Sequence, residues 1–194
     1  GERGIFNREA ADKQVARNGR RETGHMWGTN PCSEIILRPY QFCNLSEVVV
    51  RESDTLDSLK RKVRLATILG TMQSTLTDFK YLRKVWKDNT EDERLLGVSL
   101  TGIMDHSVLS KSVDSPRWLE EMRQVAVDTN KEYAEKLGIP QSAAITCVKP
   151  SGTVSQLVDA ASGIHARHSK YYIRTVRGDN KDPLTQFLKE QGVY

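Results

Sequence analysis

The sequence predicts an α/β protein in which buried parallel strands are joined and covered by helices. Two long stretches, residues 56–79 and 114–137, repeat apolar residues at three- and four-residue steps, which is typical of amphipathic helices. Short β-branched and aliphatic runs at 45–51, 94–100 and 143–148 are typical of buried strands. Because parallel strands need a crossover connection, usually a helix, this alternation favours a parallel sheet.

Residues at the boundaries define the first two helices. A short surface helix is predicted over 7–17, because Asn7 can accept hydrogen bonds in the first turn and Gly19 can close the end. Asp54 or Thr55 can cap the first long helix in the same way. Its buried stripe is expected to consist of apolar residues, namely Leu56, Leu59, Val63, Ala66, Ile68 and Leu69.

The second half of the chain carries its own boundary signals. Pro116 suits the first turn of the second long helix, and Gly138 suits its end. Cys147, in the strand run at 143–148, is expected to be a core residue. The remaining predictions are a polar connection over 81–93, a further strand over 171–176 and a short helix over 182–191.

Composition describes an ordinary globular chain with reduced thiols. The 194 residues are 38% hydrophobic and 28% charged, enough for one domain or part of one. No run of eighteen apolar residues and no apolar leader is present, so neither a membrane span nor a secretory signal is predicted. The three cysteines form no C-x-x-C pair, which argues against a disulfide scaffold and a zinc site and favours the cytoplasm.

Charge does not identify a partner by itself. A net charge of +4 suits a polyanionic small molecule as well as nucleic acid. A basic run on the first long helix resembles a nucleic-acid patch, but no aromatic residue is interleaved to stack on bases. The run is therefore predicted to be a solvated helix face; its members are Lys60, Arg61, Lys62 and Arg64.

A thiol, an amide and a carboxylate alternate near the N-terminus. Asn30, Cys32 and Glu34 are two residues apart, so in an extended chain their side chains would project to the same side. Pro31 favours extended geometry at Asn30. This arrangement suits a reaction site, although a lone cysteine is more often a small buried hydrophobe. A second cysteine, Cys43, follows eleven residues after the first.

A Ser/Gly/Thr loop follows the strand run at 143–148. Its hydroxyls and exposed N–H groups suit a phosphate, above all if a helix begins just after it. The motif is weak alone, because Pro-Ser-Gly is common in turns and Lys149 precedes the loop, unlike a Walker A lysine. The loop residues are Pro150, Ser151, Gly152, Thr153, Val154 and Ser155, and the basic residues beyond it that suit a triphosphate are His165, Arg167, His168, Lys170, Arg174 and Arg177.

Taken together, these motifs resemble the ribonucleotide reductases, and most closely the adenosylcobalamin-dependent (class II) ones. Asn30-Pro31-Cys32-Ser33-Glu34 resembles the finger loop at the centre of the family's ten-stranded α/β barrel, and Phe42-Cys43-Asn44-Leu45-Ser46-Glu47 resembles the strand that follows. Lys149 to Ser155 resembles the loop that holds the substrate phosphates, and Gly1 to Gly4 the stretch before the finger loop. The eleven-residue interval between the two cysteines points to class II.

The resemblance implies a thiyl-radical reduction of ribonucleoside triphosphates. Cys32 would abstract a hydrogen atom from C3′. Glu34 would be the base toward the 3′-hydroxyl, and Asn30 would orient that hydroxyl by hydrogen bonds. Cys43 would supply one of two reducing equivalents and end in a disulfide. The implied cofactor is adenosylcobalamin, which generates the radical, and the implied reductant is thioredoxin or a similar dithiol.

The resemblance also implies that residues 1–194 are part of a single catalytic barrel domain, with the finger loop at 29–38 and the phosphate-binding loop at 149–155. The family's second reducing cysteine, its C-terminal cysteine pair and its effector region match nothing in this sequence. We therefore expect an inactive piece of a larger chain, completed by the remainder of the reductase. Two alternatives remain: a non-catalytic nucleotide- or anion-binding module with inert thiols, and a ribonucleoside-diphosphate reductase of another class, glycyl-radical or di-iron.

Overall fold

A parallel pair of strands forms the centre of the protein. The computed structural model describes residues 4–17, 20–173 and 175–193. Strand β3 (Asn44–Val49) pairs in parallel with β4 (Leu96–Thr101) along their whole length. On the other edge of β4, Thr146 forms a single parallel bridge with Val98. The predicted α/β class is confirmed, and the predicted strand at 143–148 lies beside the sheet but is reduced to this bridge.

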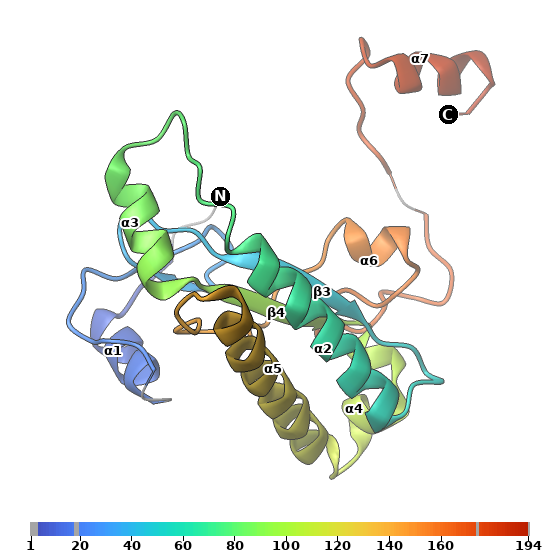
Figure 1. The fold of residues 1–194 in the computed structure, drawn as a ribbon. Coiled ribbons are helices and arrows are strands. Elements are labelled where there is room, and N and C mark those ends of the chain that lie inside the picture. The colour runs from blue at the N-terminus through green and yellow to red at the C-terminus, as the bar shows by residue number, and fades with distance from the viewer. Residues whose placement is uncertain (1–3, 18–19, 174, 194) are drawn as a thin grey trace.

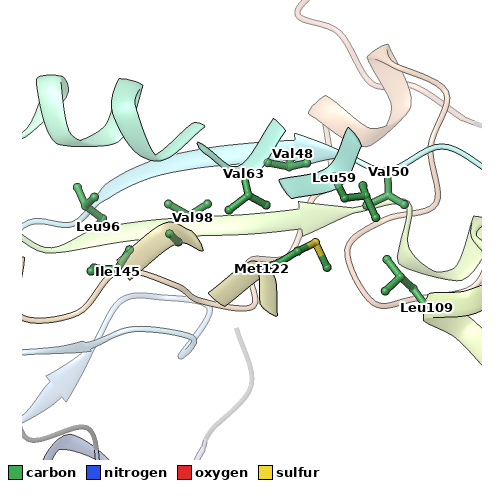
Figure 2. Packing of buried hydrophobic residues seen from close by; sticks show 10 residues of the cluster. Val48, Val50, Leu59, Val63, Leu96, Val98, Leu109, Met122 and Ile145 are labelled. Carbon is green, nitrogen blue, oxygen red and sulfur yellow. The ribbon is translucent and has the colours of Figure 1, made fainter. Parts of the chain in front are cut away.

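Two long helices pack against each other and cover the strands (Figure 1). They are α2 (Leu56–Gln73) and α5 (Ser115–Leu137), and α2 contacts both β3 and β4. As predicted, α5 has a proline in its first turn and ends at Gly138, whose φ is +64°. Figure 2 shows the core between these layers, which consists of Val48, Val50, Leu59, Val63, Leu96, Val98, Leu109, Met122, Ala126 and Ile145.

The buried face of α2 differs from its predicted stripe. Leu59 and Val63 are buried as predicted, but Leu69 is exposed and the buried positions of the later turns include Thr67 and Thr71. The hydroxyl of Thr67 donates to the carbonyl of Val63, and that of Thr71 to the carbonyl of Thr67. Because these hydroxyls are satisfied within the helix, they can be buried. The helix also ends at Gln73, earlier than predicted, while Thr55 caps its start as predicted.

A helix replaces the polar connection predicted over 81–93, so that prediction is wrong. Helix α3 (Lys84–Glu93) buries Thr90 and Glu93, and Arg94 ends it with a φ of +43°. The ring of Trp86 stacks on that of Phe42, with centroids 4.7 Å apart. The contacts of α3 are made by one aromatic ring and by buried polar groups. Its sequence therefore shows no continuous apolar stripe, which is the pattern that predicts a helix.

The N-terminal region forms a small second core. Helix α1 (Arg8–Ala16) begins as predicted, with Oδ1 of Asn7 accepting from the N–H of Ala10. The predicted helix end at Gly19 and residues 1–3 of the opening lie outside the described residues. Strands β1 (Gly28–Thr29) and β2 (Ile36–Leu37) form an antiparallel hairpin after the helix. The buried residues that join them are Ala11, Val15 and Trp27.

The described residues from 164 to 193 are largely exposed, and short helices lie at one end of the sheet. The short helices η1 (Ile103–Asp105), α4 (Ser107–Lys111) and α6 (Val154–Leu157) lie near the sheet end, and α7 (Pro183–Glu190) lies apart from the rest of the protein (Figure 1). Helix α7 is capped by Asp182 and confirms the predicted final helix. The strand predicted over 171–176 is absent from the described residues 171–173 and 175–176. No described helix is both long and apolar enough to cross a membrane.

Candidate functional site

The loop that carries the first cysteine is a turn, not an extended segment. It connects β1 to β2, and Ser33 adopts a left-handed φ of +64°. The N–H of Ser33 donates to the carbonyl of Asn30 (3.0 Å), and the N–H of Ile35 donates to Oδ1 of Asn30 (3.1 Å). The prediction that Asn30, Cys32 and Glu34 project from an extended chain is therefore wrong, because the Asn30 amide folds the chain back on itself.

The turn nevertheless places the thiol and the carboxylate at one lysine. The ammonium of Lys149 lies 2.9 Å from Oε1 of Glu34 and 3.8 Å from Sγ of Cys32. The Glu34 side chain is 5% exposed, whereas Cys32 is exposed to solvent. Cys32 and Glu34 thus share a site through a residue of the second loop, 115 residues after Glu34 in the sequence.

The Glu34 carboxylate is held in its charged form. Burial opposes ionisation, but contacts with the side chains of Lys149 and Asn30 outweigh it and keep the pKa of Glu34 below its ordinary value. The same contact with Glu34 raises the pKa of Lys149. At neutral pH the pair therefore consists of a carboxylate and an ammonium, and the carboxylate can accept a proton.

The other two cysteines lie together at Gly97 on β4. A β-carbon at Gly97 would lie 3.2 Å from Sγ of Cys43 and 3.0 Å from Sγ of Cys147. Burial, reinforced by Cys147 and Glu34, raises the pKa of Cys43 to about 12. Burial and the charge of Glu34 raise the pKa of Cys147 to about 11. Both groups are therefore protonated thiols, and Cys147 is a partly exposed neighbour of Cys43 rather than the core residue that was predicted.

The predicted phosphate loop is ordered by its own serines. Ser151 and Ser155 are buried, and Oγ of Ser151 accepts from the N–H of Ser155 (3.1 Å) while Oγ of Ser155 donates to the carbonyl of Ser151. The N–H of Lys149 donates to Oγ of Ser99 on β4 (2.9 Å). The loop residues that remain exposed to solvent are Pro150, Gly152, Thr153 and Val154.

A cavity of about 450 Å³ lies between this loop and β3. Its lining combines Lys149 and the loop residues up to Val154 with Leu45, Ser46 and Glu47 of β3. Oγ of Ser46 and Oε1 of Glu47 are buried and find no hydrogen-bond partner among the described residues. Lys149 therefore joins two features, the turn with Cys32 and Glu34 and the cavity at the predicted phosphate loop.

The basic residues beyond the loop that the structure describes are absent from the lining of this cavity. Nε of Arg167 lies 2.9 Å from Oδ1 of Asp105, and its Nη1 lies 2.7 Å from Oδ1 of Asp159. These ion pairs engage Arg167 within the protein, so its predicted part in a triphosphate cluster is not supported. Arg174 lies outside the described residues.

The basic run on α2 is a solvated helix face, as predicted. Lys60 pairs with Glu121, Lys62 with Asp54, and Arg64 with Glu132, while Arg61 is exposed. Acidic partners on α5 and just before α2 neutralise most of this face, which disfavours a polyanion there. No three His, Cys, Asp or Glu side chains gather as metal ligands in the described part of the chain.

Sequence reasoning missed the part played by two residues. Lys149 was predicted as the first residue of the phosphate-binding loop and as no Walker A lysine, and nothing in the local sequence pairs it with Glu34. Gly97 lies in a buried strand run, where a glycine indicates a close approach of other atoms, but its neighbours Cys43 and Cys147 are distant in sequence.

The fold is that of a ribonucleotide reductase segment. A crystal structure of a B12-dependent (class II) ribonucleotide reductase superposes with a TM-score of 0.60 at 24% identity, over 76% of this chain and 23% of that one. The layered arrangement around β3 and β4 is therefore part of the fold of that class of protein.

Sequence comparison names the particular relatives. The adenosylcobalamin-dependent ribonucleoside-triphosphate reductase of Lactobacillus acidophilus is 31% identical over 86% of this chain and 26% of its own length. Those of Lacticaseibacillus paracasei and Euglena gracilis are each 31% identical, over 100% and 86% of this chain and 29% and 22% of theirs. No protein-family model matches. The chain is thus a relative of the adenosylcobalamin-dependent ribonucleoside-triphosphate reductases and spans about a quarter of their length.

Proposed function

We propose that this chain forms part of the active site of a reductase that converts ribonucleoside triphosphates to 2′-deoxyribonucleotides for DNA synthesis. Residues 1–194 would belong to a single catalytic barrel domain completed by further chain, as the length of the relatives suggests. The observation that carries the proposal is the contact of Lys149 with both Glu34 and Cys32, beside the cavity of the predicted phosphate loop. A nucleotide in that cavity would bring its ribose to the turn.

The proposed cofactor is adenosylcobalamin, after the names of the relatives. When bound, it supplies a radical by homolysis of its cobalt–carbon bond. The described residues include no cluster of three or more metal-ligating side chains.

Glu34 and Cys32 have complementary parts in the first half of the reaction. Cys32, as a thiyl radical, takes the hydrogen atom from C3′ and becomes a thiol, which leaves the radical on the ribose. Glu34 accepts the proton of the 3′-hydroxyl, and its pKa below the ordinary value means that it is ionised at neutral pH and free to take that proton. The 2′-hydroxyl then takes a proton from one of the two reducing thiols and leaves as water, and Glu34 later returns its proton to the 3′-oxygen. Asn30 orients the turn through its bond to Ile35.

Cys43 has the properties of a hydrogen donor in the second half. Its pKa of about 12 keeps it protonated, so it can deliver a hydrogen to the ribose. Cys43 and a second thiol lose two electrons and form a disulfide, and Cys32 returns its hydrogen to C3′. In sum, one ribonucleotide and two thiols give one deoxyribonucleotide, one disulfide and one water.

A reductant and a compartment also belong to this proposal. The disulfide must be reduced after each turnover, and the proposed reductant is thioredoxin or a similar dithiol. The proposed compartment is the cytoplasm, whose reducing conditions suit the three free cysteines. A direct role in nucleic-acid binding is not part of the proposal, because the basic face of α2 is paired with acids.

The test is the conversion of CTP to dCTP by the complete protein that contains these residues, with adenosylcobalamin and dithiothreitol. We expect turnover that requires the cobalamin, is abolished in Cys32→Ser and is limited to a single turnover in Cys43→Ser. Cys147→Ser is the matched control and should retain turnover.

Other outcomes select the alternatives. Reduction that ignores the cobalamin, or that prefers CDP, would indicate a reductase of another class. Nucleotide binding without reduction in any form of the protein would indicate a non-catalytic binding module. Full activity in Cys32→Ser would contradict the proposed radical site.

A further inference from the structure

Lys149 occupies an unusual position between two loops. Its backbone N–H is fixed to Oγ of Ser99 on β4, at 2.9 Å. The ammonium of its side chain lies 2.9 Å from Oε1 of Glu34 and 3.8 Å from Sγ of Cys32, on the turn between β1 and β2. The lysine therefore connects the central strand, the predicted phosphate loop and the turn.

The buried carboxylate of Glu34 depends on this lysine. The contact with Lys149 is the only ion pair that Glu34 makes among the described residues. Its side chain is 5% exposed, and a buried carboxylate without a compensating cation is strongly disfavoured. Without Lys149, we expect Glu34 either to take up a proton or to turn toward solvent, and in both cases it would no longer be a positioned base.

We propose that Lys149 is a positioning residue that clamps the turn with Cys32 and Glu34 against the loop at 150–154. This inference rests on the proposed reductase function, because it assigns the clamp to the ribose end of a nucleotide bound at that loop. The clamp sets the distance between the phosphate-binding end and the reacting end of the site. It also keeps Glu34 ionised beside the sulfur that takes the C3′ hydrogen.

The geometry distinguishes this role from direct phosphate binding. A lysine that binds phosphate presents its ammonium to the loop cavity as a point charge. Here the ammonium is engaged by Glu34 at 2.9 Å, and the pair is neutral as a unit. Loss of the clamp should therefore lower kcat, whereas loss of a phosphate ligand would mainly raise KM.

The first test follows the ionisation of Glu34 in the 194-residue chain, without any turnover. The carboxyl carbon of ¹³C-labelled glutamate is titrated by NMR, and Glu34→Gln assigns the resonance. We expect the Glu34 midpoint to move to higher pH in Lys149→Met and to return toward the original value in Lys149→Arg. Lys131→Met removes an exposed lysine of α5 and should leave the midpoint unchanged.

The second test measures the pH dependence of kcat in the complete protein with CTP. We expect Lys149→Met to lower kcat by about tenfold to a hundredfold with little change in KM, because a displaced base loses much of its effect. The acidic limb of the profile should move to higher pH, in parallel with the Glu34 titration. Lys149→Arg should return the acidic limb toward its original pH, and Lys131→Met should give the same pH profile of kcat as the unchanged protein.

The outcomes separate this inference from the proposed function. An unchanged Glu34 midpoint in folded Lys149→Met would overturn the clamp, whatever the activity. A shifted midpoint in a protein that never reduces nucleotides would leave the coupling of Lys149 to Glu34 intact and overturn the reductase proposal. A rise in KM at constant kcat would identify Lys149 as a phosphate ligand and overturn the clamp.

Discussion

Arg21 and Glu93 form a buried ion pair across 72 residues of sequence. Nε and Nη2 of Arg21 donate to the two carboxylate oxygens at 2.7 and 2.8 Å, and the side chains are 6% and 7% exposed. Nη1 of Arg21 also donates to the carbonyl of Ile36 on β2, at 2.7 Å. One guanidinium therefore fixes the hairpin that carries the Cys32 turn to the end of α3.

Removal of Arg21 should be strongly destabilising. In Arg21→Met the carboxylate of Glu93 would stay buried with less of its compensation, and breaking such a pair typically costs about 3–5 kcal/mol. Urea unfolding followed by circular dichroism measures the change. Lys84→Met breaks an exposed helical pair with Asp88 and should cost less than about 1 kcal/mol. Equal effects of the two substitutions would contradict the structural role of Arg21.

The same pair predicts a dependence of stability on pH. Burial opposes ionisation of Glu93, but Arg21 outweighs it, so the pKa of Glu93 in the folded protein lies below its ordinary value of 4.5. Its contribution is thus complete above that value and is lost as the pH falls through the lower, folded pKa. In Glu93→Gln the free energy of unfolding, measured in urea at a series of pH values below 5, should fall less steeply as the pH is lowered. A slope equal to that of the unchanged protein would refute the assignment.

A methyl group at Gly97 should disturb the thiol pair. It would lie 2.5 Å from Cδ2 of Leu45 and 3.2 Å or less from the sulfurs of Cys43 and Cys147. We expect Gly97→Ala to lower the free energy of unfolding by about 1–3 kcal/mol, as overpacking usually does. Gly28→Ala meets nothing within 4 Å and is the matched control. Equal free energies of unfolding for the two variants would show that the space around Gly97 accommodates a methyl group.

The three cysteines should differ in their reaction with iodoacetamide at pH 8. Cys32 is exposed, whereas Cys43, with a pKa of about 12, is ionised in only about one molecule in ten thousand at that pH. Peptide mass spectrometry over time should show Cys32 modified well before Cys43 and Cys147. Simultaneous modification of the three under native conditions would contradict the described burial.

Local signals in the sequence predicted much of the fold. Helix caps at Asn7 and Thr55 are local, and the structure confirms both. Helix α3 was missed because its buried groups are polar, and Glu93 is compensated by Arg21, which is far away in the sequence. A hydrophobic pattern contains no information on such a partner.

The structure brings Cys32 and Glu34 to one lysine, as the sequence pattern placed them together. The turn folded by Asn30 replaces the predicted extended alternation of the side chains. The lysine that brings them together belongs to a loop distant in sequence, and no local pattern relates Lys149 to Glu34. The assigned chemical roles stay predictions.

The proposed function requires that the Cys32 turn and the loop at 149–155 form one nucleotide site. Its most direct measurement is the rate of Cys32 alkylation in the complete protein with and without saturating CTP. We predict that CTP slows alkylation, that cytidine does not, and that Thr153→Glu, which places a negative charge in the loop, abolishes the protection. Bound CTP that leaves the Cys32 rate unchanged would show that the two loops do not share a ligand and would contradict the claim.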